Sequence, residues 1–383
     1  MDSKLKFIDL CSGIGGFHQA LKNNENENEH ECVMSCDIDP LCRESYKNNY
    51  NIESEKDLSK LTIENIPNFD ILCAGFPCQP FSKAGSREGF KDSRGNIFFD
   101  ICKIIDYHKP KYIILENVRN LVSHDKGKTF KIVIETLEDL NYNVSHIILN
   151  ALYFSVPQNR ERIIIMGKRK DMGIIPDFPK FKKEHTSLSD IIDHINNVPD
   201  LSDKLIVTRN IWNEFLCILK DNRCPIPKFP IWTDTWDTVV SDDFYKMYKS
   251  TIDKNKTFYE DNIDILEPWL IESRGNELWK GAIRKLEWQA GTDSGTLDET
   301  LWSPRGSGIR AKRLDYSPTL VAMASMIPIY GPYSRHLTPR ECARLQSFPE
   351  EFILHKDPKV NYKHFGNAVN VKMISWCVSF LIN

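Results

Sequence analysis

Short apolar runs and amphipathic stretches alternate through about the first 170 residues of the chain. The apolar runs are short and continuous, which is typical of strands buried on both faces of a sheet; they lie at 7–10, 32–36, 70–74, 111–115, 144–149 and 162–166. The stretches between them have helical character at 17–21, 41–50, 97–107 and 130–140. This alternation predicts an α/β fold with a mostly parallel, doubly wound sheet that helices cover on both faces.

The alternation fades from about residue 172. Prolines interrupt the following segment at 176, 179, 225, 227 and 230, and seven of the eight tryptophans lie between Trp212 and Trp302. Aromatic residues can form a small core without regular layers, and we expect most of these tryptophans to do so. The pattern predicts a second, smaller and irregular domain.

Composition narrows the class of protein. A hydrophobic content of 41% and a charged content of 27% are ordinary for a soluble globular protein, and we see neither an apolar run of membrane-spanning length nor an export signal. The eleven cysteines are scattered and never have zinc-site spacing, so we expect free thiols, a reducing compartment and no metal. A net charge of -3 leaves nucleic-acid binding open, provided that basic residues cluster locally.

Four candidate functional residues fall at the carboxyl ends of predicted strands: Gly13, Asp37, Cys78 and Glu116. Ligands of parallel α/β sheets bind beyond these ends, so we expect the four residues to meet at one edge. Cys78 stands between two prolines, and a stiff turn of this kind presents a reactive thiol. A single cysteine beside a buried strand is more often a small core residue, but the convergence of four candidates favours a nucleophile.

A glycine-rich turn and a later acidic residue indicate a nucleoside cofactor. Residues 13–16 join the first strand to a helix, whose free N–H groups and positive dipole end can bind a ligand. Asp37 follows the second strand, about twenty residues further on, where an acid can accept hydrogen bonds from ribose hydroxyls. Ile38 could cover one face of an adenine. The alternative is a tight turn and a loop acid without a ligand.

Six ordered motifs resemble those of DNA (cytosine-5)-methyltransferases of the bacterial restriction-modification type, which use S-adenosylmethionine. The motifs are Phe-x-Asp-Leu-x-Ser-Gly-x-Gly-Gly-Phe at 7–17, Gly-Phe-Pro-Cys-Gln-Pro-Phe-Ser at 75–82, Glu-Asn-Val at 116–118, Gln-Asn-Arg-Glu-Arg at 158–162, Leu-Thr-Pro-Arg-Glu-Cys-Ala-Arg-Leu-Gln-Ser-Phe-Pro at 337–349 and Phe-Gly-Asn-Ala-Val at 365–369. The resemblance implies a Rossmann-like methyltransferase domain at 1–171 and a target-recognition domain at 172–357, which includes the late Leu-Thr-Pro-Arg-Glu motif. Residues 358–383 would return to the catalytic domain.

The resemblance also implies a mechanism. Carbon 5 of cytosine is a poor nucleophile until another nucleophile adds at carbon 6, and the Cys78 thiolate would make that addition. Glu116 would protonate or hydrogen-bond ring N3 and the exocyclic amine, and Arg162 would contact the base carbonyl with Arg160 as a supporting contact. The alternative for both arginines is a surface ion-pair face with Glu161. Water would accept the carbon 5 proton as Cys78 is released.

Residues from both ends of the chain are implied to bind S-adenosylmethionine. These are Phe7, Gly13, Gly15, Phe17, Asp37, Ile38, Asp57, Leu58, Pro77, Asn367 and Val369. Asp37 would bind the ribose, and Asp57 would meet the adenine amine while Leu58 donates its N–H. Asp37 stands where many relatives have glutamate, Cys11 and Ser12 replace the more usual Phe-Ala, and Ser155 occupies a position that is often glycine. These departures concern the details of cofactor contact.

Duplex DNA is the implied partner, and its target cytosine must flip out to reach Cys78. The implied substrate contacts are Ser82, Lys83, Arg94, Asn117, Arg160, Arg305, Arg310, Arg313 and Thr319. Residues 82–96 resemble a mobile loop that closes on DNA, and residues 302–313 combine glycines with clustered basic residues suited to groove and phosphate contacts.

Two other functions are compatible with these motifs. One branch of the family methylates tRNA, but the long recognition region and the missing Cys-Phe-Thr signature argue against it. A non-catalytic DNA-binding relative would usually have lost the Pro-Cys pair, the glutamate of Glu-Asn-Val or the glycine turn, and all three are present. We expect a monomer in the cytoplasm, or in the nucleus of a eukaryotic host, with a separately acting cognate restriction endonuclease as a potential partner.

Overall fold

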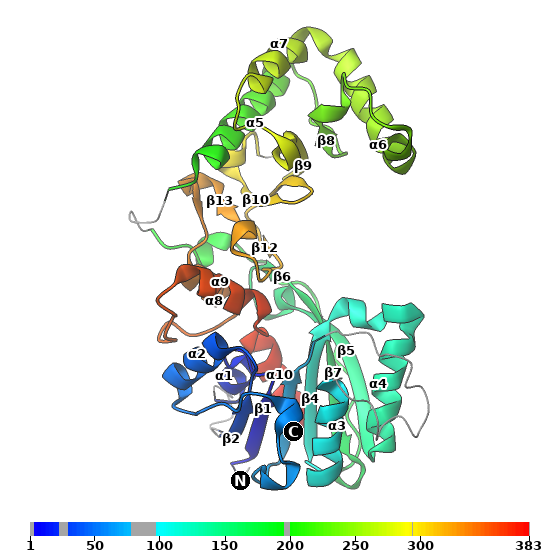
Figure 1. Ribbon diagram of the computed structural model, residues 1–383, viewed down its shortest axis with the longest axis vertical. Helices are drawn as coiled ribbons and strands as arrows, with labels where there is room; N and C mark the ends of the chain where they lie inside the picture. Colours follow the sequence, from blue (N-terminus) through cyan, green and yellow to red (C-terminus); the bar gives the residue numbers. More distant parts are fainter. Residues whose placement is uncertain (1–3, 23–29, 78–96, 195–199, 293, 383) are drawn as a thin grey trace. The chain divides into compact units, whose positions relative to one another are not determined.

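The computed structural model describes residues 4–22, 30–77, 97–194, 200–292 and 294–382 (Figure 1). The chain divides into two compact units. The first comprises Met1–Thr186, Pro318–Ala322 and Cys342–Asn383, and the second comprises Ser187–Ser317 and Met323–Glu341. Each unit is therefore assembled from segments that are not contiguous in the sequence.

These boundaries differ from the predicted ranges 1–171, 172–357 and 358–383, because residues on both sides of the second unit pack in the first. The ring centroids of Phe178 and Phe380 are 5.2 Å apart, and those of Phe181 and Trp376 are 4.9 Å apart. Further along, Gln346 Nε2 donates to the carbonyl of Phe365 over 2.7 Å. The first unit accordingly extends to Thr186 and resumes at Cys342.

A six-stranded sheet forms the centre of the first unit, in the order β2-β1-β3-β4-β7-β5. The strands are β1 (Lys6–Leu10), β2 (Glu31–Cys36), β3 (Ile71–Gly75), β4 (Tyr112–Val118), β5 (Tyr142–Asn150) and β7 (Glu161–Arg169). The four strands β2, β1, β3 and β4 pair in parallel, as predicted, whereas β7 is antiparallel to both of its neighbours. The connection from β5 to β7 holds only a 3-10 helix, Ala151–Phe154, and β6 (Gln158–Asn159). A parallel pairing would need a longer crossover.

Helices accompany this sheet (Figure 1). They are α1 (Gly16–Lys22), α2 (Pro40–Tyr50), α3 (Ile97–His108), α4 (Lys128–Asp139), α9 (Pro358–Asn367) and α10 (Val371–Ile382), and α8 (Pro339–Leu345) begins at the end of the second unit. Ile113 and Leu115 of β4 share a core with residues of α3 and α4, while Ile114 is equally buried on the other face of the strand. Burial on both faces confirms the predicted α/β class.

One segment, Pro358–Ile382, is long and apolar enough by composition to resemble a membrane span. It consists of the separate helices α9 and α10, and 61% of its most apolar window is buried within the protein. Helix α10 packs on α1 and contacts β4. Its apolar character is therefore that of a core helix.

The second unit is more regular than expected. It contains α5 (Asp203–Asp221), α6 (Asp242–Asp261) and α7 (Ile263–Arg274), together with a sheet in the order β14-β13-β10-β11-β9-β8. The strands are β8 (Ile231–Trp232), β9 (Lys285–Gln289), β10 (Leu301–Arg305), β11 (Gly308–Lys312), β13 (Ile329–Tyr330) and β14 (Arg335–His336), and β12 is Ser317–Pro318. A tryptophan-rich core holds these elements together, as predicted, through Trp212, Trp236, Trp269, Trp279, Trp288 and Trp302.

The sheet of the second unit has one apolar and one charged face. Leu286 of β9 and Ile309 of β11 are register partners and belong to the tryptophan-rich core. Their neighbours Glu287 and Arg310 are also register partners and form an ion pair of 2.6 Å on the other face. The period-two alternation therefore separates the core from a charged surface.

The Leu-Thr-Pro-Arg-Glu motif has a structural explanation at the start of α8. The Glu341 backbone N–H donates to Thr338 Oγ1, and the Thr338 N–H donates to Glu341 Oε2. This reciprocal pair is a capping box. Glu341 is also fully buried against Arg335, with an N–O distance of 2.7 Å.

The end of α9 allows no side chain at Gly366. A Cβ there would lie 2.4 Å from the carbonyl carbon of Val321 and 2.5 Å from the backbone nitrogen of Ala322. We predict that Gly366→Ala lowers the free energy of unfolding by roughly 2–3 kcal/mol, because backbone atoms must move to admit the methyl group. Urea denaturation of the full chain measures this change.

Gly75→Ala is the matched control, because the nearest atom to its added Cβ would be 3.8 Å away, which is an ordinary contact. Equal unfolding free energies for the two variants would contradict the close approach at Gly366.

Candidate active site

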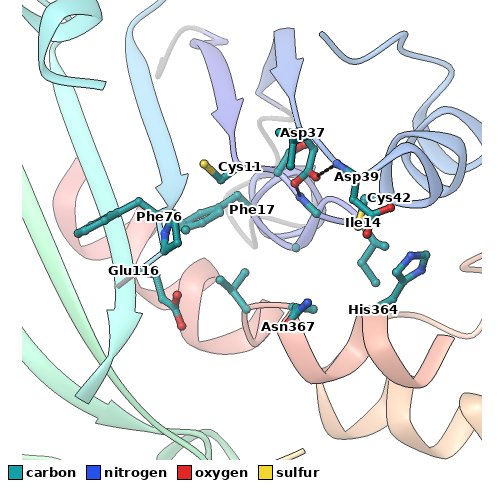
Figure 2. Close-up of a pocket in the computed structure, with 18 of the residues that line it drawn as sticks. Cys11, Ile14, Phe17, Asp37, Asp39, Cys42, Phe76, Glu116, His364 and Asn367 are labelled. Carbon is teal, nitrogen blue, oxygen red and sulfur yellow. Dashed lines mark hydrogen bonds between the residues drawn. The ribbon is translucent and has the colours of Figure 1, made fainter. Parts of the chain in front are cut away.

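A cavity of about 630 Å³ opens at the carboxyl ends of the central strands of the first unit (Figure 2). Its lining comes from the glycine turn after β1, the ends of β2, β3 and β4, residues 160 and 162, and residues 363, 364 and 366–369 near the end of the chain. The strand-end residues Gly13, Asp37 and Glu116 meet there as expected. Cys78 lies outside the described residues, although Phe76 and Pro77, which precede it, line the cavity.

Asp37 is anchored by backbone N–H groups. Its Oδ2 accepts from Gly13 over 2.7 Å and its Oδ1 accepts from Asp39 over 2.8 Å. Burial raises the pKa of Asp37, and the two backbone hydrogen bonds oppose that rise. Asp39 in turn caps α2 and pairs with Lys363 over 2.7 Å. The acid predicted to bind ribose is therefore fixed against the glycine turn.

Other predicted cofactor contacts also line the cavity. Ile38 keeps 77% of its surface exposed, which suits a side chain that covers a planar ligand. Asp57 caps the 3-10 helix Leu58–Lys60, because its Oδ1 accepts from the Ser59 N–H over 3.1 Å. The remaining predicted contacts in the lining are Gly13, Phe17, Leu58, Pro77, Asn367 and Val369.

Phe7 and Gly15 do not line the cavity. Phe7 is fully buried in β1, where its ring packs edge-on to His18 with centroids 5.4 Å apart. Gly15 has a φ of 86° and makes room for Tyr50, whose ring would lie 2.2 Å from an added Cβ. These two motif residues support the glycine turn, and their contact with the cofactor stays a prediction.

Glu116 and Arg162 form the charged pair of the site. Glu116 lies near the end of β4, next to Gly75 of β3, and its Oε1 is 2.8 Å from Arg162 Nε. Glu161 instead pairs with Arg119 over 2.6 Å. Arg162 is thus directed at the cavity, and the alternative of a surface ion-pair face with Glu161 does not describe it.

Asn117 fixes the strand end that leads to Cys78. Its Nδ2 donates to the carbonyl of Phe76 over 2.8 Å, and the side chain is buried. The side-chain amide of Asn117 thus holds the backbone just before Pro77. The resemblance had implied that Asn117 contacts the substrate. The predicted contacts Ser82, Lys83 and Arg94 lie, like Cys78, outside the described residues.

Arg160 is a buried clamp. It is 1% exposed, and its guanidinium donates to the carbonyls of Leu320, Gly366 and Ala368 over 3.2, 3.2 and 2.7 Å. Burial lowers the pKa of Arg160, and the charge of Arg162 acts in the same direction. The three carbonyls compensate a cation that is out of water. Arg160 therefore supports the site from within the protein and was incorrectly placed in a surface face by the alternative above.

Thr319 is also used internally, since its Oγ1 donates to the carbonyl of Asn159 over 2.7 Å. The remaining predicted DNA contacts lie in the second unit. Arg310 pairs with Glu287, and Arg313 Nε donates to the carbonyl of Ala290 over 3.0 Å. Arg305 is half-buried, and its Nε has no hydrogen-bond partner in the described part of the chain.

The sequence did not single out His364, which lines the cavity together with Cys36 and Cys42. A helical spacing of three residues separates His364 from the predicted contact Asn367, and this spacing was the available signal. Cys36 and Cys42 lie in stretches whose pattern predicts only a strand and a helix, so the sequence did not indicate that they line a cavity.

A mostly parallel sheet with an acid fixed at the end of its second strand and a glycine turn is typical of α/β proteins that bind nucleoside ligands. A family model for C-5 cytosine-specific DNA methylases matches residues 5–380. The chain belongs to this family and is a DNA cytosine-5 methyltransferase of the restriction-modification type.

Curated relatives span almost the whole chain. The type II methyltransferase M.BanI of Aneurinibacillus aneurinilyticus is 34% identical over 97% of this chain and 94% of its own length. The type II methyltransferase M.HhaI of Haemophilus parahaemolyticus is 31% identical over 97% of this chain and 92% of its own length.

Solved structures confirm the fold. The methyltransferase EhMeth of Entamoeba histolytica has a TM-score of 0.58 at 15% identity, covering 100% of this chain and 98% of its own. A DNMT2 variant of Spodoptera frugiperda has a TM-score of 0.56 at 20% identity, covering 100% of both chains.

The clamp at Arg160 generates a prediction. Arg160→Met leaves three buried carbonyls without their donor, so we expect the free energy of unfolding to fall by about 2–4 kcal/mol. Differential urea denaturation against the wild-type chain measures this loss.

Arg119→Met is the control, since Arg119 is 61% exposed in its ion pair with Glu161, and its loss should change stability by less than about 1 kcal/mol. If both variants unfolded at the same urea concentration, Arg160 would not be a clamp.

Proposed function

We propose that the cavity binds S-adenosylmethionine and a flipped cytosine side by side, and that Cys78 is the nucleophile that activates the base. One observation carries the proposal. Glu116, paired with Arg162, lines the same cavity as Asp37 and lies next to the strand whose continuation, Phe76-Pro77, precedes Cys78. A nucleoside cofactor and a target base would therefore bind in the same cavity.

The residues present fit the proposed cofactor. A volume of about 630 Å³ is in the range of small-molecule sites. Asp37 offers a carboxylate for ribose hydroxyls, and the exposed side chain of Ile38 offers an apolar surface for adenine. Asn367 and Val369 close the cavity from the carboxyl-terminal segment. When bound, the cofactor supplies an electrophilic methyl group.

The chain's own groups would perform the remaining steps. The Cys78 thiolate forms a bond from Sγ to carbon 6 of cytosine, and the electron pair of the 5,6 double bond moves toward carbon 5. Glu116 accepts a hydrogen bond from the exocyclic amine and gives a proton to ring N3, which neutralises the negative charge that the thiolate brings to the ring, and it takes this proton back when the thiolate leaves. After carbon 5 has taken the methyl group, water removes its proton. The electron pair restores the double bond and expels the thiolate.

Arg162 would orient Glu116 through their 2.8 Å contact and reach the base carbonyl. Asn117 would hold the backbone before Cys78 through the Phe76 carbonyl. Neither group needs to change its protonation state, so both would act by positioning the reacting atoms.

We further propose that the charged face of the second unit's sheet binds DNA phosphates. Arg305, Arg310 and Lys312 lie on this face. Glu287 is the carboxylate that interacts electrostatically with these cations. Burial lowers the pKa of Lys312, and so do the charges of Arg310 and Arg305. Cations that repel one another are stabilised when a phosphate approaches.

The curated relatives favour DNA over tRNA as the substrate, because they are type II methyltransferases. A short specific target sequence, a separately acting cognate endonuclease, a monomeric state and a cytoplasmic location are further parts of the proposal. They rest on the same similarity.

The mechanism predicts different effects for two substitutions. Cys78→Ala should abolish methylation and leave S-adenosylhomocysteine binding intact, because only the bond to carbon 6 is lost. Glu116→Gln should lower kcat by roughly 10²–10⁴-fold, because an amide cannot give a proton to ring N3 as negative charge builds on the ring. Radiolabelled methyl transfer to duplex DNA measures both, and bisulfite sequencing of cells that express the wild-type chain identifies the target.

DNA containing 5-fluorocytosine should trap the wild-type protein covalently, but not Cys78→Ala. Methylation by Cys78→Ala would refute the nucleophile, and preferential labelling of tRNA by the wild-type chain would refute the substrate.

The charged face predicts a loss of DNA affinity that is independent of sequence. Arg305→Ala and Lys312→Ala should each weaken binding to target and non-target duplexes alike, and should reduce the salt dependence of log K by about 1. Fluorescence anisotropy across a salt series measures both quantities.

Lys204→Ala, which removes an exposed charge from the start of α5, is the control for net charge. An equal effect of this variant, or a loss confined to the target sequence, would contradict phosphate binding by the sheet face.

A further inference from the structure

His364 is a buried polar residue of the cavity that the proposed mechanism does not use. It lies in α9, lines the cavity and is only 4% exposed. Its Nε2 is buried and has no hydrogen-bond partner among the residues that the structure describes. Such an atom carries a desolvation cost unless a ligand satisfies it.

The surroundings of the ring determine what Nε2 can offer. Nδ1 makes a long contact of 3.5 Å with Ser45 Oγ of α2. If the Ser45 hydroxyl donates to Nδ1, the ring proton resides on Nε2, which is then a donor. Burial lowers the pKa of His364 to about 4, so the ring is neutral at neutral pH. In this tautomer His364 is a neutral donor, which suits a hydroxyl oxygen.

The position of His364 in the cavity indicates which part of the ligand it would contact. Figure 2 places His364 on the side of the cavity that carries Cys42 and Asp39, away from Glu116. Asp37, which lies near Asp39, already accepts one backbone hydrogen bond on each carboxylate oxygen. Two ribose hydroxyls donate and also accept, and carboxylates only accept. A donor on this side of the cavity would complement Asp37.

We propose that His364 Nε2 donates a hydrogen bond to a ribose hydroxyl of the nucleoside cofactor, which makes His364 a cofactor-binding residue. The inference rests on the proposed function, because it requires that S-adenosylmethionine occupies this cavity. Asp37 accepts from the hydroxyl pair, and His364 donates to one of the two oxygens. Helix α9, near the carboxyl terminus, would thereby contact the ribose directly.

Isothermal titration of the full chain with S-adenosylhomocysteine, and with its 2′-deoxy and 3′-deoxy forms, tests the proposal without methyl transfer. His364→Ala should weaken binding of S-adenosylhomocysteine roughly tenfold, and His364→Gln, whose amide nitrogen can donate, should restore most of it. The loss in His364→Ala should disappear with the one deoxy form that lacks the contacted hydroxyl. His355→Ala is the control, because His355 lies near His364 but does not line the cavity.

Each result has a distinct meaning. An equal loss for all three ligands in His364→Ala would show a packing role and overturn the proposal, and so would wild-type affinity in that variant. Failure of the wild-type chain itself to bind S-adenosylhomocysteine would instead refute the proposed cofactor.

Discussion

The buried guanidinium of Arg160 is the interaction on which the site depends. A cation that is 1% exposed must be surrounded by oxygen atoms, and its acceptors come from Leu320, Gly366 and Ala368, at least 160 residues away in sequence. The last two carbonyls flank Asn367, a lining residue of the cavity. The clamp thus fixes the carboxyl-terminal wall of the cavity to the segment that also carries Arg162.

The two acids of the cavity are held in different ways, and this difference suits two tasks. The Glu116 carboxylate pairs with Arg162 over 2.8 Å, and its backbone is the register partner of Gly75 in β3. Asp37 has only backbone N–H partners, so its charge is not cancelled by a neighbouring cation at hydrogen-bond distance in the described chain. The arginine holds Glu116 in one orientation toward the base, whereas an acid on backbone donors provides directional acceptors for hydroxyls.

The sequence was sufficient for the central sheet and for the residues at its strand ends, because local apolar runs determine parallel strands and ligands gather at their carboxyl ends. The sequence did not indicate features that depend on other segments. The pattern did not assign β7 its antiparallel direction, and the hydrogen bonds of Arg160 and Thr319 go to carbonyls far away in sequence. The helices of the second unit also escaped prediction, since Pro268 interrupts the pattern of α7 and charged residues dominate α6.

The insertion of the second unit into the first has a consequence for synthesis of the protein. Gly366, Asn367 and Ala368 leave the ribosome after the entire second unit, yet they complete the cavity and satisfy Arg160. The first unit consequently folds with long-range contacts that form late, which slows folding relative to a contiguous domain. A nascent chain still lacking this segment has not completed the lining of the cavity, so we expect catalytic competence only once the carboxyl-terminal helices have been translated.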